Sequence, residues 1–392
     1  MILKPHSLAV LFMLVFMLVV GTHTVAAQQT KHPKANPNAG AGSIIVQGKL
    51  GGLIFGFDVD QNGNLGVLSE ANILDNGTVQ AAVEIFDQTT GAILKVVKRS
   101  QTKDDLITLG IVGNSIGLVE REHPITPFNV QRSFRALNPL SSGQLNAPWT
   151  PPIDQEHIIT RVSRIQGGNT AFLATDVSGP HIPVVFSSNV AANTFGPVIQ
   201  ITDNDFNFEN DPVLAYNSVT NQAVLGHNTN SQFIVPPKIG IVNLSTGSFF
   251  KFTGLGLGVI NGIAVDSEDN VICTTTSFDP AVQFYNRNTG SRISVLLPNT
   301  SENDGTFRGQ AVEFDPINKL FLVAQPFTST GTSGSSIQLY DIDGAFVESV
   351  DGLSFNGTGN VFPVHMALNP ARRTGFVDGP DTTVTEFQSF TY

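Results

Sequence analysis

Side chains that bind ligands or transfer protons are scattered singly along this sequence rather than grouped in one motif. They are Glu156, His157, Arg161, Asn210, Asp211, Asn261, Arg308, Gln310, Glu313 and His365. Histidine and carboxylate side chains drawn from separate segments can hold a metal ion or act as general acid and base. Any chemistry here therefore depends on a fold that brings distant segments together.

These residue types suggest different roles. Asp211 and His365 are the candidates for proton transfer, and Asn261 is the candidate metal ligand. Asn261 and the other seven are candidates for ligand binding. Arg161 and Glu313 fall in the middle of expected strands, where a buried charge is costly unless it is paired. They are either structural ion-pair members or channel-lining groups that orient a ligand.

Further polar residues fall where loops are expected between the second and third strands of a repeated unit. These are Glu70, Glu122, His123, His181, His227 and Asp279. The single cysteine, Cys273, lies in an apolar segment and indicates a buried side chain rather than a nucleophile. The sequence contains no phosphate loop, zinc-protease or CxxC motif.

A segment of roughly fifty residues recurs along the chain, and it must position these side chains. Its clearest copies span 211–254, 260–299 and 309–352. Each copy reads as four short strands separated by turns, which is typical of one blade of a β-propeller. Counting the turns predicts an all-β, seven-bladed β-propeller with four-stranded antiparallel blades.

The same alignment predicts the organisation of the chain. A spare strand at 43–50 should complete the last blade and close the ring, which removes open sheet edges. The propeller would then occupy 43–392, with blades near 53–99, 105–150, 156–203, 210–254, 260–299, 309–352 and 363–392.

Two kinds of connection separate the two faces of such a ring. The turns DQTTG, NLSTG, NRNTG and DIDG begin with Asp or Asn and end with Gly. The first residue can accept hydrogen bonds from its own turn, and glycine supplies a positive φ. The loops on the other face are irregular, and variable loops on a rigid scaffold are where function usually lies.

The N-terminus has the layout of a secretory signal peptide, with a cation, an apolar core and a small-residue end at 1–27. The rival interpretation is a membrane anchor, but the apolar core is shorter than the roughly 20 residues that span a bilayer. Residues 28–42 read as a flexible leader. We therefore expect a secreted or periplasmic protein without a membrane span after cleavage.

Charged residues make up only 14% of the chain, and its formal net charge is −11. An acidic surface repels phosphate backbones, so nucleic acid is excluded as the expected partner. The expected partner is a small molecule or an extracellular protein, and the expected state is a monomer.

The pattern GIAVD…VQFYNRNTG resembles the secreted YVTN-type and NHL-type propeller repeats. The chain is also similar, more weakly, to the gluconolactonase and regucalcin group. That resemblance implies a divalent cation such as calcium at the channel mouth, with Asn261 of INGIAVD as one ligand. The first unit reads GLIFGFD where that group carries a Glu-Gly-Pro segment. The virginiamycin lyase group is another resemblance, but its paired His and Glu have no equivalent here.

Three functions remain open on the sequence alone. The first is an exported propeller that binds a small ligand or protein partner at the loop-rich face. The second is a metal-assisted lactonase, hydrolase or lyase, in which the cation polarises a carbonyl group. The third is a scaffold of a surface or matrix.

Overall fold

The structure is a computed structural model. It describes residues 34–61, 63–73, 79–100, 104–112, 115–122, 131–137, 152–153, 157–163, 168–176, 182–189, 192, 194–203, 206, 213–227, 238–252, 260–268, 270–276, 282–296, 311–325, 335–353, 365–378 and 386–392. These residues belong to one compact unit, Pro33–Tyr392. Every regular element among them is a β-strand.

The strands form antiparallel sheets in which the chain runs from the innermost strand outwards. The first sheet contains β2 (Leu53–Val59), β3 (Leu65–Ile73), β4 (Val79–Asp87) and β5 (Ile93–Ser100). The second contains β6 (Asp104–Val112), β7 (Ser115–Glu122) and β8 (Gln131–Leu137). The third contains β9 (His157–Val162), β10 (Asn169–Asp176), β11 (Pro183–Asn189), β12 (Thr194–Phe195) and β13 (Ile199–Gln200).

Four more sheets follow the same plan. The fourth contains β14 (Val213–Asn217), β15 (Gln222–His227), β16 (Lys238–Asn243) and β17 (Phe249–Phe252). The fifth contains β18 (Ile260–Val265), β19 (Val271–Thr276), β20 (Val282–Asn286) and β21 (Arg292–Leu296). The sixth contains β22 (Val312–Asp315), β23 (Leu320–Gln325), β24 (Ser335–Asp341) and β25 (Phe346–Leu353). The last contains β26 (Met366–Asn369), β27 (Thr374–Asp378), β28 (Glu386–Thr391) and β1 (Gly40–Gln47).

The prediction of an all-β propeller is confirmed, but the prediction of seven four-stranded blades is wrong. Six sheets have four or more strands and are complete blades. The remaining sheet, β6-β7-β8, has only three strands within the described residues. The period in the sequence counts turns, and this segment has its turn but shows no fourth strand among the described residues.

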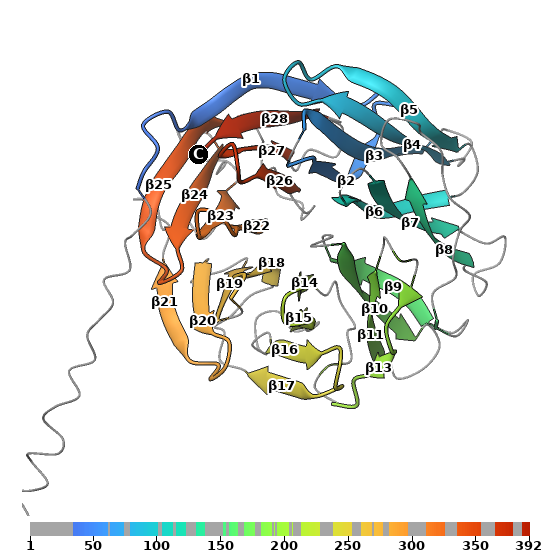
Figure 1. The fold of residues 1–392 in the computed structure, drawn as a ribbon, viewed down its shortest axis with the longest axis vertical. Coiled ribbons are helices and arrows are strands. Elements are labelled where there is room, and N and C mark those ends of the chain that lie inside the picture. The colour runs from blue at the N-terminus through green and yellow to red at the C-terminus, as the bar shows by residue number, and fades with distance from the viewer. Residues whose placement is uncertain are drawn as a thin grey trace, which may run out of the picture. The chain divides into compact units, whose positions relative to one another are not determined.

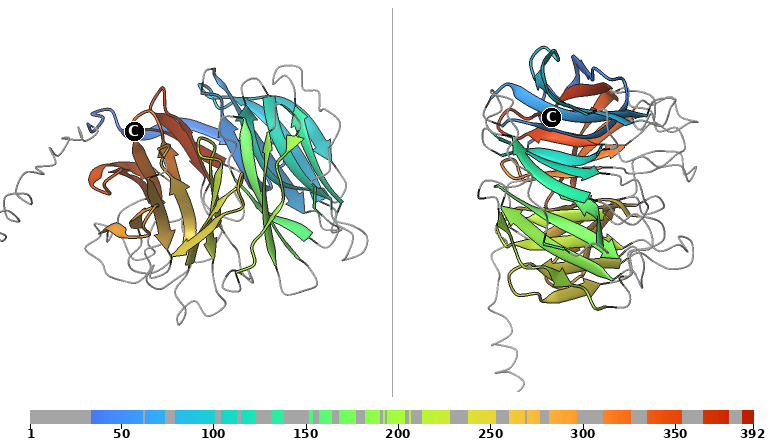
Figure 2. Two further views of the ribbon diagram at one scale, coloured as in Figure 1. Left: turned by 60° about the horizontal axis from the view of Figure 1, so that its bottom comes forward. Right: turned by 90° about the vertical axis from the view of Figure 1, so that its right-hand side faces the viewer.

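The innermost strands contact one another in sequence order, and β26 contacts β2, so the sheets close into a ring. Figure 1 shows these strands, β2, β6, β9, β14, β18, β22 and β26, around the centre of the unit. Figure 2 shows the sheets standing on edge beside one another.

The two ends of the described chain meet in the last sheet. β1 is its outermost strand and pairs with β28 from Gly40–Thr391 to Gln47–Glu386. The expected pairing of an N-terminal strand with the last sheet is therefore present, although β1 begins inside the segment that was expected to be a leader. We call this β1–β28 pair the seam.

Residues beyond the ladder reinforce the seam. The Asn36 side-chain amide donates to the main-chain oxygen of Tyr392 at 2.8 Å, and its backbone N–H donates to Glu348 at 2.8 Å. Glu348 also pairs with Arg373 at 3.2 Å, and this ion pair is largely buried. Hydrogen bonds to charged groups are among the stronger ones in proteins, so these contacts hold both chain ends against the sixth and last sheets.

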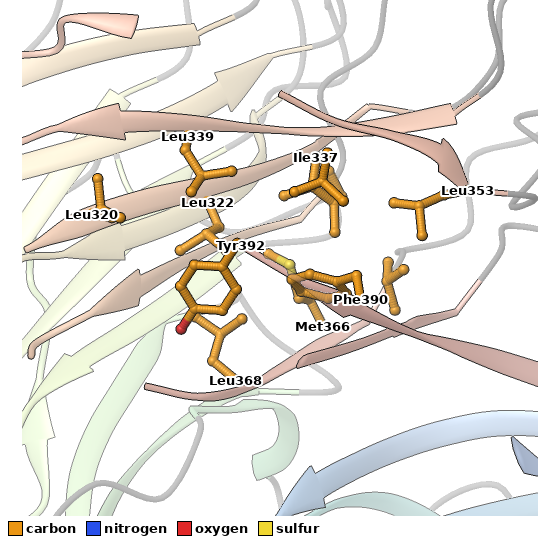
Figure 3. Close-up of a cluster of buried hydrophobic side chains, with 12 residues drawn as sticks. Leu320, Leu322, Ile337, Leu339, Leu353, Met366, Leu368, Phe390 and Tyr392 are labelled. Atoms are coloured by element: carbon orange, nitrogen blue, oxygen red, sulfur yellow. The ribbon is translucent and has the colours of Figure 1, made fainter. Parts of the chain in front are cut away.

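The core lies between neighbouring sheets. Alternation along β18 sends Ile263 and Val265 into the cluster shared with the fourth sheet and Ala264 into the cluster shared with the sixth, as its sequence predicts. The cluster between the sixth and last sheets joins Leu322 and Leu339 to Tyr392 and other apolar residues (Figure 3). The fifth sheet is thus buried on both faces, which explains its dense apolar composition.

The regular turns have the predicted chemistry. Asp87 and Asn243 each accept hydrogen bonds from the backbone of their own turns. Gly91, Gly247 and Gly290 close such turns with positive φ. These turns therefore keep the third and fourth strands of the first, fourth and fifth sheets in register.

The turns after the innermost strands also join neighbouring sheets. The side-chain amide of Asn217 donates to the carbonyl of Asp266 at 3.0 Å, and that of Asn369 donates to the carbonyl of Asp60 at 3.2 Å. Asn318 makes the same kind of bond to Pro370. The ends of the innermost strands therefore lie together on one face of the ring, which we call the turn face, and their beginnings lie on the opposite face.

Within the described residues, no helix is long and apolar enough to cross a membrane.

Candidate functional site

Three predicted site residues lie where innermost strands begin, on the face opposite the turn face. His157 is the first residue of β9, Asn261 is the second residue of β18, and His365 immediately precedes β26. All three are half-buried. The structure therefore places polar side chains from three sheets on one face of the ring, and we call His157, Asn261 and His365 the rim residues.

Asn261 occupies a β-bulge. Ile260 pairs with Thr276 and Gly262 pairs with Thr275, so Asn261 has no ladder partner. A bulge re-aims the side chain of the extra residue and often occurs near functional sites. Similar register shifts interrupt β2, β6 and β9. The irregularity is thus a repeated property of these strands.

His365 lies beside the first sheet. Its ring meets Phe57 of β2 edge-on, with centroids 6.3 Å apart. Phe57 in turn stacks on Phe387 at 4.6 Å. A rigid aromatic cluster therefore fixes one side of His365, while its half-buried position leaves part of the ring accessible to solvent.

Arg161 and Glu313 lie within β9 and β22, as the sequence predicts, and both are half-buried. Arg161 is paired in the ladder with Leu173, and Glu313 with Leu322. Neither side chain is enclosed in a dry core. This exposure agrees with a solvated position on an innermost strand.

The other candidate residues lie outside the described residues. These are Glu156, Asn210, Asp211, Arg308 and Gln310, together with His123, His181 and Asp279 from the loops. The prediction that Asp211 transfers a proton therefore stays a prediction.

Two residues assigned to loops lie in strands instead. Glu70 is in β3 and His227 ends β15, and both are buried. His227 packs against Phe206, with ring centroids 5.5 Å apart. Glu122 is also a strand residue, the last of β7. The loop assignment was wrong because these second strands extend further than the repeat alignment implied.

Glu70 has a structural role that the sequence did not reveal. Its Oε1 accepts a 2.6 Å hydrogen bond from the backbone of Leu50, and Glu84 of β4 accepts one from Lys49 at 3.1 Å. Both carboxyl groups thus bind the segment that joins β1 to β2. Burial raises the pKa of Glu70, and the backbone N–H groups of this segment partly offset that effect. An acidic residue between apolar neighbours in LSEANI was the available signal.

Two negative findings limit the chemistry of the described part of the chain. Within it, no group of three or more His, Cys, Asp or Glu side chains could hold a metal ion. Cys273 is fully buried, and burial raises the pKa of its thiol well above the ordinary value. The expectation that Cys273 is not a nucleophile therefore agrees with its surroundings.

Comparison with known proteins supports the fold and no narrower assignment. No protein-family model matches the sequence, and no curated protein matches it. Among solved structures, the chain is similar to the β-propeller domain of Cps50 (Swd1) from Myceliophteria thermophila, with a TM-score of 0.53 and 10% sequence identity. The match covers 89% of this chain and 98% of that domain. At this identity the likeness establishes a β-propeller fold alone.

Proposed function

We propose that this chain is an exported binding protein that holds a small ligand or a protein partner at the rim residues. The observation that carries this proposal is the placement of His157, Asn261 and His365 at the beginning of three innermost strands, half-buried on one face. Donors and acceptors on rigid strands lose little entropy when they bind, which favours recognition. Export rests on the signal-like N-terminus alone.

The side-chain chemistry of the rim residues suits ligand binding better than catalysis of one particular reaction. Imidazole and amide groups both donate and accept hydrogen bonds, and they suit polar ligands of several kinds. They come from different sheets, so one ligand in contact with all three would bridge the ring.

A thermal-shift screen of the purified chain against amino acids, sugars and lactones tests this proposal. We expect at least one compound to raise the melting temperature of the wild type. His157→Ala, Asn261→Ala and His365→Ala should weaken that response. Arg372→Ala is the matched control because Arg372 lies on the turn face, where it bonds to Asn64. Equal responses in the rim variants and the wild type would overturn the proposal.

A further inference from the structure

The turn face carries the two most exposed large apolar side chains among the described residues. Val219 is 77% exposed and Ile317 is 61% exposed. Each is the third residue of a turn at the end of an innermost strand, β14 or β22. The first residue of the turn, Asn217 or Asp315, accepts a hydrogen bond from the backbone N–H of the third, at 2.9 Å and 2.8 Å. This bond fixes the turn, so Val219 and Ile317 project into solvent, and we call them the apolar tips.

A second group of exposed apolar side chains lies at the outer margin of the same face. The turns between third and fourth strands bond to the turns after the innermost strands, so both sets of turns belong to the turn face. Gln88 N–H donates to the carbonyl of Asn64 at 2.6 Å, and Leu244 N–H donates to that of Asn221 at 2.9 Å. The outermost strands begin just after these turns, and their exposed apolar residues there are Leu94, Phe250, Ile293 and Phe346.

The exposed charges on this side of the ring are mostly basic. Among the described residues of these turns and of the first three positions of the outermost strands, the exposed charged residues are Lys95, Lys251, Arg292, Lys319 and Arg372 against Glu268 and Asp343. Lys251 and Lys319 pair with Asp203 and Glu268, but ion pairs at the surface are weak. The whole chain has 21 basic and 32 acidic residues, so the turn face carries the opposite balance.

The apolar tips are held rigidly and stand apart from each other. The side chains of Asn217 and Asn318, in the same two turns, bond to the carbonyls of Asp266 and Pro370 in the next sheets. Rigid groups lose little freedom when they bind. The fifth sheet lies between the two tips, so they are separate projections. A protein partner would need a matching pocket for each projection, whereas a fluid lipid surface takes up separate apolar side chains without one.

We propose that the turn face binds the surface of a lipid bilayer that contains anionic phospholipids. The apolar tips enter the boundary between headgroups and acyl chains, and the basic side chains pair with the phosphate groups. The net charge of −11 is repelled by such a surface, so only the basic face can approach it, and binding orients the protein. This inference goes beyond the proposed function, because it leaves the rim residues on the opposite face open to a ligand from solution.

Co-sedimentation with vesicles tests the inference, using protein purified after export from cells. The probes are vesicles of phosphatidylcholine with phosphatidylglycerol and vesicles of phosphatidylcholine alone, which should bind more weakly. Val219→Ser and Ile317→Ser together should weaken binding to the anionic vesicles about tenfold or more. Arg292→Gln and Arg372→Gln should each weaken it about fivefold.

Lys49→Gln is the matched control for the arginine variants. Lys49 is exposed and lies in the segment that leads into the beginning of β2, on the face opposite the turn face. Its substitution removes the same charge, so the change in net charge is equal and only its place differs. We expect Lys49→Gln to bind the anionic vesicles as the wild type does. All of these positions are exposed, and circular dichroism checks that each variant is folded.

A dye attached at one apolar tip reports directly on contact with lipid. Cys273 is the only cysteine and is fully buried, so a dye that reacts with thiols labels the new cysteine of Ile317→Cys. An environment-sensitive dye there should shift its emission to shorter wavelength when anionic vesicles are added. The same dye on Glu386→Cys should not respond, because Glu386 is exposed at the beginning of β28, on the opposite face.

Three outcomes would count against this inference. If the tip and arginine variants bind vesicles as well as the wild type, or if the dye at position 317 does not respond, the turn face does not bind lipid. If that dye responds to poly-L-aspartate and not to vesicles, the face binds acidic proteins instead, and the proposal is wrong. The thermal-shift test of the rim residues contains no vesicles, so either proposal can fail while the other stands.

Discussion

Tyr392 provides the sharpest test of how the ring is held closed. Its side chain is fully buried between the sixth and last sheets (Figure 3). Its hydroxyl donates to Asp315 Oδ2 at 2.9 Å. Asp315 lies in β22, so this bond joins the end of the last sheet to an innermost strand of its neighbour. Tyr392→Phe removes the hydrogen bond and keeps the buried ring.

The free energy of unfolding that Tyr392→Phe should lose follows from the charge of the acceptor, the Asp315 carboxylate. A hydrogen bond to a carboxylate contributes about 1.5–3 kcal/mol. Asp315 Oδ2 keeps its bond from Asn318 at 2.6 Å, so we expect the lower end, a loss of about 1.5 kcal/mol for Tyr392→Phe. Tyr392→Ala also removes the ring, and truncating a buried aromatic side chain costs about 3–5 kcal/mol. The guanidinium of Arg373, 5.7 Å from the ring centre, would lose its aromatic partner as well.

Urea unfolding followed by circular dichroism measures these losses. Tyr340→Phe is the matched control, because the Tyr340 hydroxyl bonds to the neutral amide of Gln338 within one strand. That bond is worth about 0.5–1.5 kcal/mol, and breaking it does not affect the contact between sheets. If Tyr392→Phe is as stable as the wild type, or loses less than Tyr340→Phe, Tyr392 does not fasten the ring in the way we describe.

Four further predictions concern other parts of the chain. Gly91→Ala should cost more stability than Gly51→Ala. Both glycines have positive φ, but only at Gly91 would an added Cβ lie 2.4 Å from the backbone oxygen of Ile45 in β1. Equal urea midpoints for the two variants would contradict this prediction. Lys319→Gly should melt at a higher temperature than Lys319→Ala, because φ at this position is 55° and glycine adopts that backbone conformation more readily than alanine. Both variants lose the same exposed ion pair with Glu268. The opposite order of melting temperatures would refute the reasoning. Burial raises the pKa of Glu70 above 4.5, so the folded state binds this proton more tightly than the unfolded state does. The stabilisation is therefore present at low pH and lost as pH rises from 4.5 through the folded-state pKa, so the stability of Glu70→Gln relative to the wild type should increase over that rise. A pH-independent difference between their urea midpoints would contradict this expectation. Finally, N-terminal sequencing of protein exported from cells should begin at or near Gln28, whereas an intact Met1 would argue against the signal peptide.

The sequence predicted the regular parts of this fold well, because local rules determine them. Ile263 and Val265 alternate with Ala264 as their pattern requires, and Gly91 and Gly247 have the positive φ that their turns require. These features depend on two or three neighbouring residues. They are therefore readable from a single chain without knowledge of its neighbours in space.

The features that failed depend on contacts between distant segments. Within the described residues the sheet β6-β7-β8 departs from the four-strand plan, and the turn period carries no information about strand pairing. Glu70 was assigned to a loop because the repeat alignment ended the second strand too early, and its hydrogen bond from the backbone of Leu50 joins separate segments. For the site, the sequence placed His157, Asn261 and His365 correctly at the beginnings of innermost strands.

The seam also determines how the ring would respond to mechanical force. Gly40 faces Thr391, so the chain enters β1 and leaves β28 at the same end of the pair. A pull on the two ends would therefore separate the strands one hydrogen-bonded pair at a time instead of shearing all of them together. The contacts of Asn36 and Tyr392 lie ahead of the first pair and would bear the load first. Tension along the chain would thus open the ring at the seam while the blades remain folded.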